Sequence, residues 1–181
     1  MAIFIVGYMA SGKTTFGEAL ARKLNKEFID LDLYIEAKHE KSVKEIFTTS
    51  GEEGFREIEK EALYEVATKT DAIIACGGGT PCFFDNMDFI NKKGVSIMLE
   101  TSLPVLVSRL LLENAKRPLV SGKSKGEIAE TIQTQLSLRM PYYSKAHIKW
   151  EGDTLENEQE IESNIKRFIE TFPFVFSKSF C

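Results

Sequence analysis

The stretch Gly7–Thr14 contains the residues with the clearest chemical meaning in the chain. It reads Gly-Tyr-Met-Ala-Ser-Gly-Lys-Thr and fits the pattern G-x-x-x-x-G-K-[ST] at every fixed position. In such a loop the backbone N–H groups and a helix N-terminus surround phosphate oxygens, Lys13 can reach the β- and γ-phosphates, and Thr14 can offer its hydroxyl to Mg²⁺. The alternative is a glycine turn before an ordinary helix. Because an apolar run precedes the motif and a helical pattern follows it, we predict a site for a nucleoside triphosphate.

Two carboxylates, Asp30 and Asp32, close a short apolar run that begins at Phe28. We expect an extended segment over 28–32, on which both side chains would share one face if the strand continued. Near a phosphate loop, one carboxylate can lie close to Mg²⁺ while the other accepts the proton of an attacking hydroxyl. The alternative is a pair of solvated turn residues. With Lys13 and Mg²⁺ as neighbours, we expect Asp32 to stay ionised near neutral pH.

Three arginines and a run of glycines could bind anionic groups. Arg56 has the planar fork that binds a carboxylate through two hydrogen bonds, and Gly77–Gly79 lets a ligand approach the backbone closely. Arg117 lies in a polar stretch, about 113–125, that could close over a transferring phosphate. Arg139 stands at the expected end of a helix, where it could simply complement the helix dipole. The alternative to anion binding is, for each arginine, an ordinary role at the protein surface.

These residues require a scaffold that brings them together, and the apolar periodicity predicts one. Short apolar runs indicate strands over 2–6, 28–32, 71–75, 95–99 and 146–150, the last at a sheet edge. Helical patterns cover about 12–24, 33–37, 43–50, 55–67, 85–91, 102–112, 125–139 and 157–171. The alternation favours an α/β fold of three layers (αβα) with a mainly parallel sheet. Ligands in such sheets bind outside the carboxyl ends of the strands, so the motifs should share one rim.

Composition excludes several other classes of protein. The 181 residues are 43% hydrophobic and 28% charged with a net charge of −4, which is typical of one globular domain and lacks the basic surface of a nucleic-acid binder. No apolar run approaches the roughly 20 residues that span a bilayer. The chain has three cysteines and two histidines, so we expect reduced thiols in a cytoplasmic protein rather than a zinc site.

Taken together, the motifs resemble those of the shikimate kinase family over nearly the whole chain, to about Trp150. The matching segments are Gly7–Thr14, Phe28–Asp32 leading into Ile35-Glu36, Gly51-Glu-Glu-Gly-Phe-Arg56 with Glu59, Gly77-Gly-Gly-Thr80, Arg117-Pro-Leu119 and Arg139-Met-Pro-Tyr-Tyr143. The resemblance implies a nucleoside-monophosphate-kinase-like fold with a five-stranded sheet. It implies one kinase domain over 1–181, with a substrate-binding helical segment at about 32–60 and a lid at about 113–125.

The activity that the resemblance implies is ATP-dependent phosphorylation of the 3-hydroxyl of shikimate, on the route to chorismate and the aromatic amino acids. Asp32, Lys13 and Arg117 would be catalytic, and Asp32, Arg56, Gly78 and Arg139 would bind shikimate. Mg²⁺ would be held by Thr14 directly and by Asp30 through a water. The residues assigned to ATP are Ala10, Ser11, Gly12, Lys13, Thr14, Thr15 and Arg117. The expected partners are these small molecules, without nucleic acid or membrane, and the expected state is a monomer.

The chain departs from the family pattern in two places. Residues 149–154 match the family's adenine-contacting segment poorly, which leaves Arg109 as a possible surface for the base, and the phenylalanine-rich tail from Phe172 has no counterpart. Two other functions stay open at this point. One is a kinase of the same fold for another small carboxylate, such as a gluconate kinase. The other is a nucleotide-binding module without catalysis, which we would expect to lack Lys13, Thr14, Asp32 or Arg117.

Overall fold

The computed structural model describes residues 1–112 and 124–176, and within these ranges five strands form one parallel sheet. The strands are β1 (Ala2–Val6), β2 (Glu27–Asp30), β3 (Ala72–Ala75), β4 (Gly94–Glu100) and β5 (Ile148–Glu151), in the order β2-β3-β1-β4-β5. Every pairing is parallel, and β5 is at the edge, as predicted. All five residues of β1 are buried, which is expected of a central strand covered on both faces.

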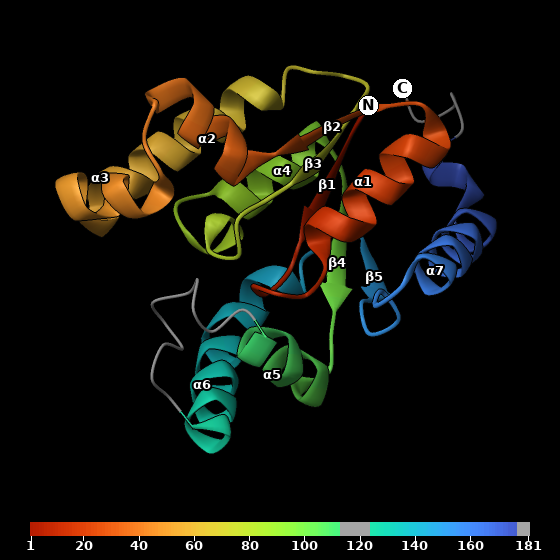
Figure 1. The fold of residues 1–181 in the computed structure, drawn as a ribbon. Coiled ribbons are helices and arrows are strands. Elements are labelled where there is room, and N and C mark those ends of the chain that lie inside the picture. The colour runs from red at the N-terminus through yellow and green to blue at the C-terminus, as the bar shows by residue number, and fades with distance from the viewer. Residues whose placement is uncertain (113–123, 177–181) are drawn as a thin grey trace.

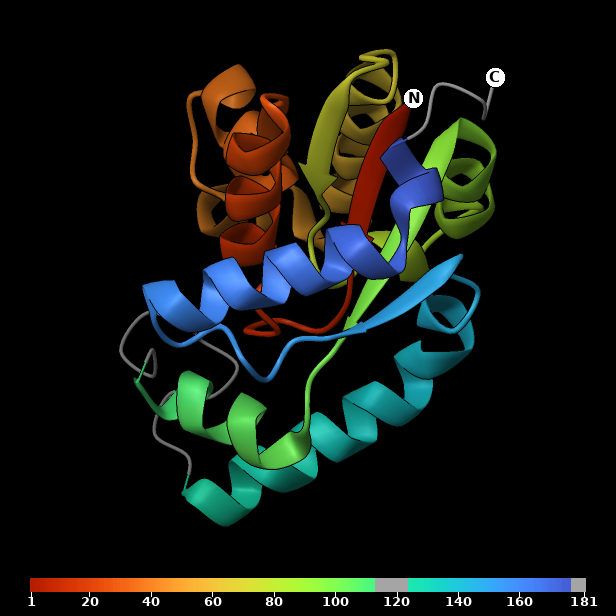
Figure 2. The same cartoon turned by 90° about the vertical axis from the view of Figure 1, so that its right-hand side faces the viewer.

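Helices cover both faces of this sheet (Figure 1). They are α1 (Lys13–Leu24), α2 (Leu31–His39), α3 (Val43–Val66), α4 (Asn86–Lys93), α5 (Leu103–Leu112), α6 (Lys125–Tyr143) and α7 (Glu158–Thr171), with 3₁₀ turns η1 (Thr80–Cys82) and η3 (Pro173–Phe176). Side chains of α1 and α7 form one core cluster, whereas those of α3, α4, α5 and α6 form the other, on the opposite face. Figure 2 shows α7 crossing in front of the strands, with α5 and α6 at their lower end. The predicted three-layer α/β architecture is confirmed.

Strand β2 is shorter than predicted, and this changes the setting of Asp32. The strand ends at Asp30, whose side chain accepts hydrogen bonds from the backbone N–H groups of Asp32 (3.1 Å) and Leu33 (3.3 Å). Asp30 is therefore the N-cap of α2. The prediction of an extended segment through Asp32 is wrong, because this capping interaction starts a helix two residues earlier.

One predicted helix boundary is confirmed and another is wrong. The break predicted at Gly51–Gly54 is present within α3 as a kink, with non-helical dihedrals at Gly51 (φ 69°, ψ −177°). Helix α6 does not end at Arg139 but continues through Pro141 to Tyr143. Pro141 has no N–H to donate to the carbonyl four residues earlier, so the helix continues past it without that hydrogen bond. The extra turn brings Tyr143 to the carboxyl end of β3, where its hydroxyl donates to the Gly78 carbonyl at 2.5 Å.

The phenylalanine-rich tail packs on the core as far as it is described. The Phe172 ring lies 5.3 Å from that of Phe168 and 5.8 Å from that of Trp150, and the Phe176 ring lies 6.1 Å from Phe168. These contacts extend the cluster between α1, α7 and the sheet. Aromatic pairs at such separations contribute about 0.5–1.5 kcal/mol beyond their buried area. The described part of the tail therefore covers one end of this core.

Within the described ranges, no helix has both the length and the apolar character needed to cross a bilayer.

Candidate active site

The phosphate-binding loop predicted at Gly7–Thr14 connects β1 to α1. Three of its residues have positive φ angles, namely Gly7 (143°), Ala10 (59°) and Gly12 (94°). A Cβ atom at Gly7 would lie 2.8 Å from the Leu99 carbonyl oxygen, so this position has no room for a side chain. Gly12 is the N-cap of α1 and supplies no capping side chain, which leaves the first N–H groups of the helix to another acceptor. A phosphate oxygen is suited to that role.

Lys13 and Thr14 extend from the first turn of α1. Lys13 is 9% exposed, and its Nζ donates to the Tyr8 carbonyl at 2.7 Å. The Thr14 hydroxyl donates to Asp30 Oδ2 at 2.8 Å, which brings the two predicted Mg²⁺ residues into contact. A hydroxyl and a carboxylate are hard oxygen donors, and Mg²⁺ typically takes few protein ligands and retains waters and phosphates. The donor set therefore fits this ion.

Asp32 follows Asp30 by two residues and lies partly buried in the first turn of α2. Burial, together with the negative charges of Asp30 and Glu59, raises the pKa of this carboxyl to about 6, although Lys13 acts to lower it. The expectation that Asp32 stays ionised near neutral pH agrees with this value, although it took account only of positive neighbours and not of burial, Asp30 and Glu59. The carboxylate is still the main form at pH 7, but a pKa of about 6 suits a general base far better than the usual 3.8.

Arg56 is held in a buried hydrogen-bonded chain. Its Nη1 donates to Glu59 Oε2 at 2.7 Å, and the other oxygen of Glu59 accepts from the Thr80 hydroxyl at 2.5 Å. The guanidinium also stacks against the Phe83 ring at 4.0 Å. Its Nε atom is buried without a hydrogen-bond partner among the described residues, which leaves a donor for a ligand. Glu59 and Phe83 therefore fix the position of a cation that retains hydrogen-bonding capacity.

The three glycines after β3 lie among these charged groups. A Cβ atom at Gly77 would stand 2.9 Å from Asp32 Oδ1, and one at Gly79 would stand 2.6 Å from Arg56 Nη2. A Cβ atom at Gly78 would stand 3.5 Å from Nη1 of Arg139. Side chains at Gly77 and Gly79 would displace the carboxylate or the Arg56 guanidinium, and one at Gly78 would come within 3.2 Å of the Met9 backbone nitrogen, so these close approaches explain the run of glycines. The strand end thus brings Asp32, Arg56 and Arg139 together around one backbone segment.

A cleft of about 230 Å³ joins the phosphate loop to this glycine segment. Eight of the site residues that were predicted from the sequence line this cleft, namely Ala10, Gly12, Lys13, Thr14, Thr15, Asp30, Asp32 and Gly78. Arg56 and Arg139 stand at its glycine end, whereas Ser11 is not part of its lining and has a buried Oγ atom. Arg117 and most of the expected lid lie outside the described residues.

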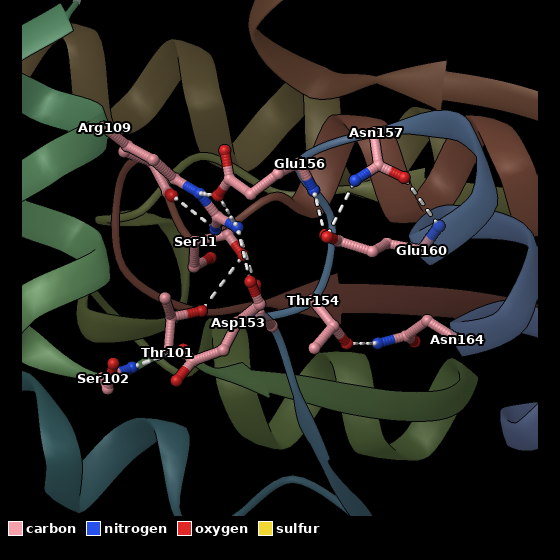
Figure 3. A network of polar contacts seen from close by, with 12 residues as sticks. Ser11, Thr101, Ser102, Arg109, Asp153, Thr154, Glu156, Asn157, Glu160 and Asn164 are labelled. Atoms are coloured by element: carbon pink, nitrogen blue, oxygen red, sulfur yellow. Dashed lines mark hydrogen bonds and ion pairs between the residues drawn. The ribbon is translucent and has the colours of Figure 1, made fainter.

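Arg109, suggested from the sequence as a surface for the adenine base, links the phosphate loop to the segment after β5 (Figure 3). Its guanidinium donates to the carbonyls of Ala10 (3.2 Å), Gly152 (3.0 Å) and Asp153 (3.3 Å), and pairs with Glu156 at 2.8 Å. These contacts fix the loop carbonyl at Ala10. Arg109 lines the cleft as well, so a base could still reach its exposed side.

Sequence reasoning gave no role to several residues that position the site. Glu59 entered only as part of the matching pattern, and Thr80, Tyr143 and Thr101 had no assigned task. The signal for Glu59 was available, because it lies three residues after Arg56 on one helix and could pair with it. No comparable signal marks Thr101, whose hydroxyl donates to the Ser11 carbonyl at 3.1 Å across ninety residues of sequence.

The two described cysteines are free, as predicted. Burial raises the pKa of Cys76 far above its usual range and that of Cys82 to about 11, so both are neutral thiols. Among the residues that the structure covers, no group of three or more His, Cys, Asp and Glu side chains could hold a metal.

The raised pKa of Asp32 predicts that Asp32→Asn stabilises the fold in a pH-dependent way. Above pH 6 the carboxyl is ionised in both states, and the charge is less favourable in the folded state, so asparagine should raise the free energy of unfolding by about 1–3 kcal/mol. Near pH 4 the folded protein already binds the proton, and the gain should largely disappear. Urea unfolding at pH 8 and pH 4 measures this. A gain of equal size at both values would contradict the pKa assignment.

Comparison with known proteins agrees with the geometry of the site. The family model for shikimate kinase matches residues 9–170. A shikimate kinase of Bacteroides thetaiotaomicron is 46% identical over 168 residues, which are 93% of this chain and 96% of that protein. The 1.7 Å crystal structure of shikimate kinase from Bacteroides thetaiotaomicron has a TM-score of 0.92 and 44% identity, covering 96% of this chain and 98% of that one. Shikimate kinase from Acinetobacter baumannii, solved in complex with shikimate, has a TM-score of 0.83 and 29% identity, covering 96% and 93%.

These relatives share the fold over almost their full length, which confirms the nucleoside-monophosphate-kinase-like architecture. The matched range, residues 9–170, extends well beyond the phosphate loop, which many unrelated kinases have, and it spans the positions of the aspartates, Arg56 and the glycine segment. This chain belongs to the shikimate kinase family.

Proposed function

We propose that the protein transfers the γ-phosphoryl group of ATP to the 3-hydroxyl of shikimate, giving shikimate 3-phosphate on the route to chorismate and the aromatic amino acids. One observation carries the proposal. A single cleft joins a phosphate-binding loop to a carboxylate with a pKa of about 6, and two arginines that can bind a carboxylate stand at its other end. Membership of the shikimate kinase family supports the same substrates.

Binding comes first in this mechanism. The loop N–H groups and Lys13 bind the phosphates, with Ala10, Ser11, Gly12, Thr14 and Thr15 contributing to the same cradle. For Ser11 the contribution is its backbone, because its side-chain oxygen is buried. Arg56 and Arg139 bind the shikimate carboxylate, and the Gly78 backbone contacts the ring. These contacts fix the acceptor hydroxyl in line with the γ-phosphorus, which is the main catalytic requirement in phosphoryl transfer.

Asp32 then acts on the acceptor hydroxyl. It orients the 3-hydroxyl and takes its proton as the new oxygen–phosphorus bond forms, while the bond from the γ-phosphorus to the bridging oxygen breaks and its electrons leave with ADP. Lys13 stabilises the charge on the phosphoryl oxygens. Bound Mg²⁺, held by Thr14 and, through a water, by Asp30, would supply further charge neutralisation at the phosphates.

The Mg²⁺ assignment predicts a specific defect for Asp30→Asn. Asparagine caps helices as well as aspartate does, so α2 should keep its N-cap while the charge beside Thr14 is lost. We expect the Mg²⁺ concentration for half-maximal activity to rise several-fold, with near-normal kcat at saturating Mg²⁺. Steady-state rates across a Mg²⁺ series measure this. An unchanged Mg²⁺ requirement would show that Asp30 does not help to hold the metal ion.

Several parts of the proposal concern features outside the cleft. Arg117 is placed at the ATP phosphates, within a lid at about 113–125 that follows α5, and the helical segment at about 32–60 is assigned to shikimate. We further propose one kinase domain over 1–181 that works as a monomer in the cytoplasm without nucleic acid. The free, neutral cysteines are compatible with a reducing compartment.

A coupled ADP-release assay tests the function directly. Shikimate, quinate, gluconate and a reaction without acceptor should be compared at saturating MgATP. We expect rapid ADP release with shikimate, and rates near that of the acceptor-free reaction with the others. Turnover with gluconate alone would support the rival kinase. A folded protein that binds ATP and phosphorylates none of these acceptors would support the inert nucleotide-binding module.

A further inference from the structure

The last residue of α6 is a fully buried tyrosine at the carboxyl end of β3. Tyr143 is 0% exposed and is among the largest fully buried side chains of the described residues. Its hydroxyl donates to the Gly78 carbonyl at 2.5 Å, a contact between residues 65 positions apart in the chain. A phenylalanine ring would fill the same space in the core. The hydroxyl is therefore explained by the polar groups that it contacts rather than by packing.

The first of these groups is the central peptide of the glycine segment. Glycine has more backbone freedom than any other residue, so three glycines in succession have little stiffness of their own. The carbonyls of Gly77 and Gly79 accept hydrogen bonds from backbone N–H groups of the following 3₁₀ turn, at 3.1 Å and 2.8 Å. Among the described residues, the hydrogen bond that holds the Gly78 carbonyl comes from α6 instead. Loss of the Tyr143 hydroxyl would release this peptide.

The second group is the guanidinium of Arg139, which lies four residues before Tyr143 and therefore on the same side of α6. Arg139 Nη1 is 3.5 Å from the position that a Cβ atom at Gly78 would take, so the guanidinium and the glycine backbone are neighbours. Burial raises the pKa of the Tyr143 hydroxyl, against the opposing effects of the Arg139 charge and of a hydrogen bond from Arg139. A neutral hydroxyl thus connects the Gly78 carbonyl to Arg139.

The two arginines at the glycine end of the cleft are held in different ways. Arg56 pairs with the buried carboxylate of Glu59 at 2.7 Å. Arg139 forms no ion pair among the described residues, and its guanidinium lies over the Tyr8 ring at 5.4 Å, beside the Tyr143 hydroxyl. A carboxylate partner would compete with an anionic ligand, whereas a ring and a neutral hydroxyl orient the guanidinium and leave its charge for that ligand.

We propose that Tyr143 is a positioning residue for the acceptor, whose hydroxyl holds the Gly78 carbonyl and the Arg139 guanidinium in the arrangement that binds the substrate ring and carboxylate. The inference rests on the proposed function, which assigns Gly78 and Arg139 to shikimate. Tyr143 does not line the cleft, so it acts through these two residues. Groups that are already in place bind a ligand without the entropic cost of ordering them, and the hydroxyl therefore contributes to shikimate affinity.

The variant Tyr143→Phe tests this role, because it removes the hydroxyl and keeps the buried ring. We expect KM for shikimate to rise about five- to tenfold, as for one lost hydrogen bond, while KM for ATP is unchanged and kcat changes much less. Calorimetric titration with shikimate should show the same weakening without turnover. The matched control is Tyr142→Phe, which removes the hydroxyl of the neighbouring residue of α6 and should leave both KM values unchanged.

A double-mutant cycle with Arg139→Lys asks whether Tyr143 acts through Arg139. Without the guanidinium, Tyr143→Phe should weaken shikimate clearly less than it does in the unaltered chain, and equal losses in both backgrounds would overturn the proposal. An active Tyr143→Phe enzyme with a normal KM for shikimate, or with equal increases in both KM values, would also overturn it and leave the proposed function intact. An unaltered chain that neither binds nor phosphorylates shikimate would overturn the proposed function together with this role.

Discussion

Replacing Asp32 by asparagine is expected to lower kcat by roughly 10²–10⁴-fold, the usual range for a positioned general base. The substitution keeps the size of the side chain and one acceptor oxygen but removes the charge that accepts the proton. The carboxyl has a pKa of about 6 because it is partly buried beside Asp30 and Glu59, so the lost group is well matched to neutral pH. ATP binding, measured by calorimetry, should persist since Gly7–Thr14 is untouched.

Two controls separate a lost base from other defects. Asp30→Asn removes a neighbouring charge and should act mainly through the Mg²⁺ requirement rather than through kcat. The Asp32→Asn protein should also be at least as stable as the unaltered chain at pH 8, so a folding defect is not the expected cause of inactivity. A near-normal kcat for Asp32→Asn would show that Asp32 is not the proton acceptor.

The pH profile provides a further measurement of the same group. As pH falls through about 6, Asp32 in the free enzyme takes up a proton, and kcat/KM for shikimate should fall tenfold per pH unit below that value. Binding of reactants changes the charge around Asp32, so the profile of kcat alone need not show the same pKa.

The fold and much of the site could be predicted because their signals are local. The phosphate loop is one continuous motif, and five apolar runs separated by helical patterns indicate a parallel sheet. The end of β2 could not be placed, because Phe28–Asp32 has an apolar pattern suited to a strand, whereas a backbone hydrogen bond accepted by the Asp30 side chain starts the helix. Capping competes with strand extension at such a boundary, and the choice depends on tertiary contacts.

The charges that surround Asp32, and therefore its pKa, could not be predicted from the sequence. Glu59 lies 27 residues from Asp32 in the chain, and it raises the pKa of Asp32 only because α3 and α2 pack together at the end of β3. The hydrogen bond of Tyr143 to Gly78 likewise joins α6 to that strand end. Such contacts depend on the packing angles of helices, which apolar periodicity does not define.

The second large effect is expected at Arg56. Arg56→Lys should cost about 2–4 kcal/mol in shikimate binding or transition-state stabilisation, which is roughly 30- to 1000-fold in kcat/KM. Lysine keeps the positive charge, but it is a point charge and cannot donate to Glu59 and to a substrate carboxylate in the geometry of a guanidinium. The affinity for ATP should hardly change. Shikimate titration and steady-state kinetics measure both quantities.

The buried partner of Arg56 makes a folding defect the main alternative explanation. Removing the cation alone would leave Glu59, 1% exposed, as an uncompensated buried charge, which typically costs 3–5 kcal/mol. The double variant Arg56→Gln with Glu59→Gln removes both charges together, so it should fold while losing the contact with the substrate carboxylate. If the double variant is folded and binds shikimate normally, Arg56 has only a structural role. If Arg56→Lys weakens ATP and shikimate equally, the defect lies in the fold rather than in recognition of the carboxylate.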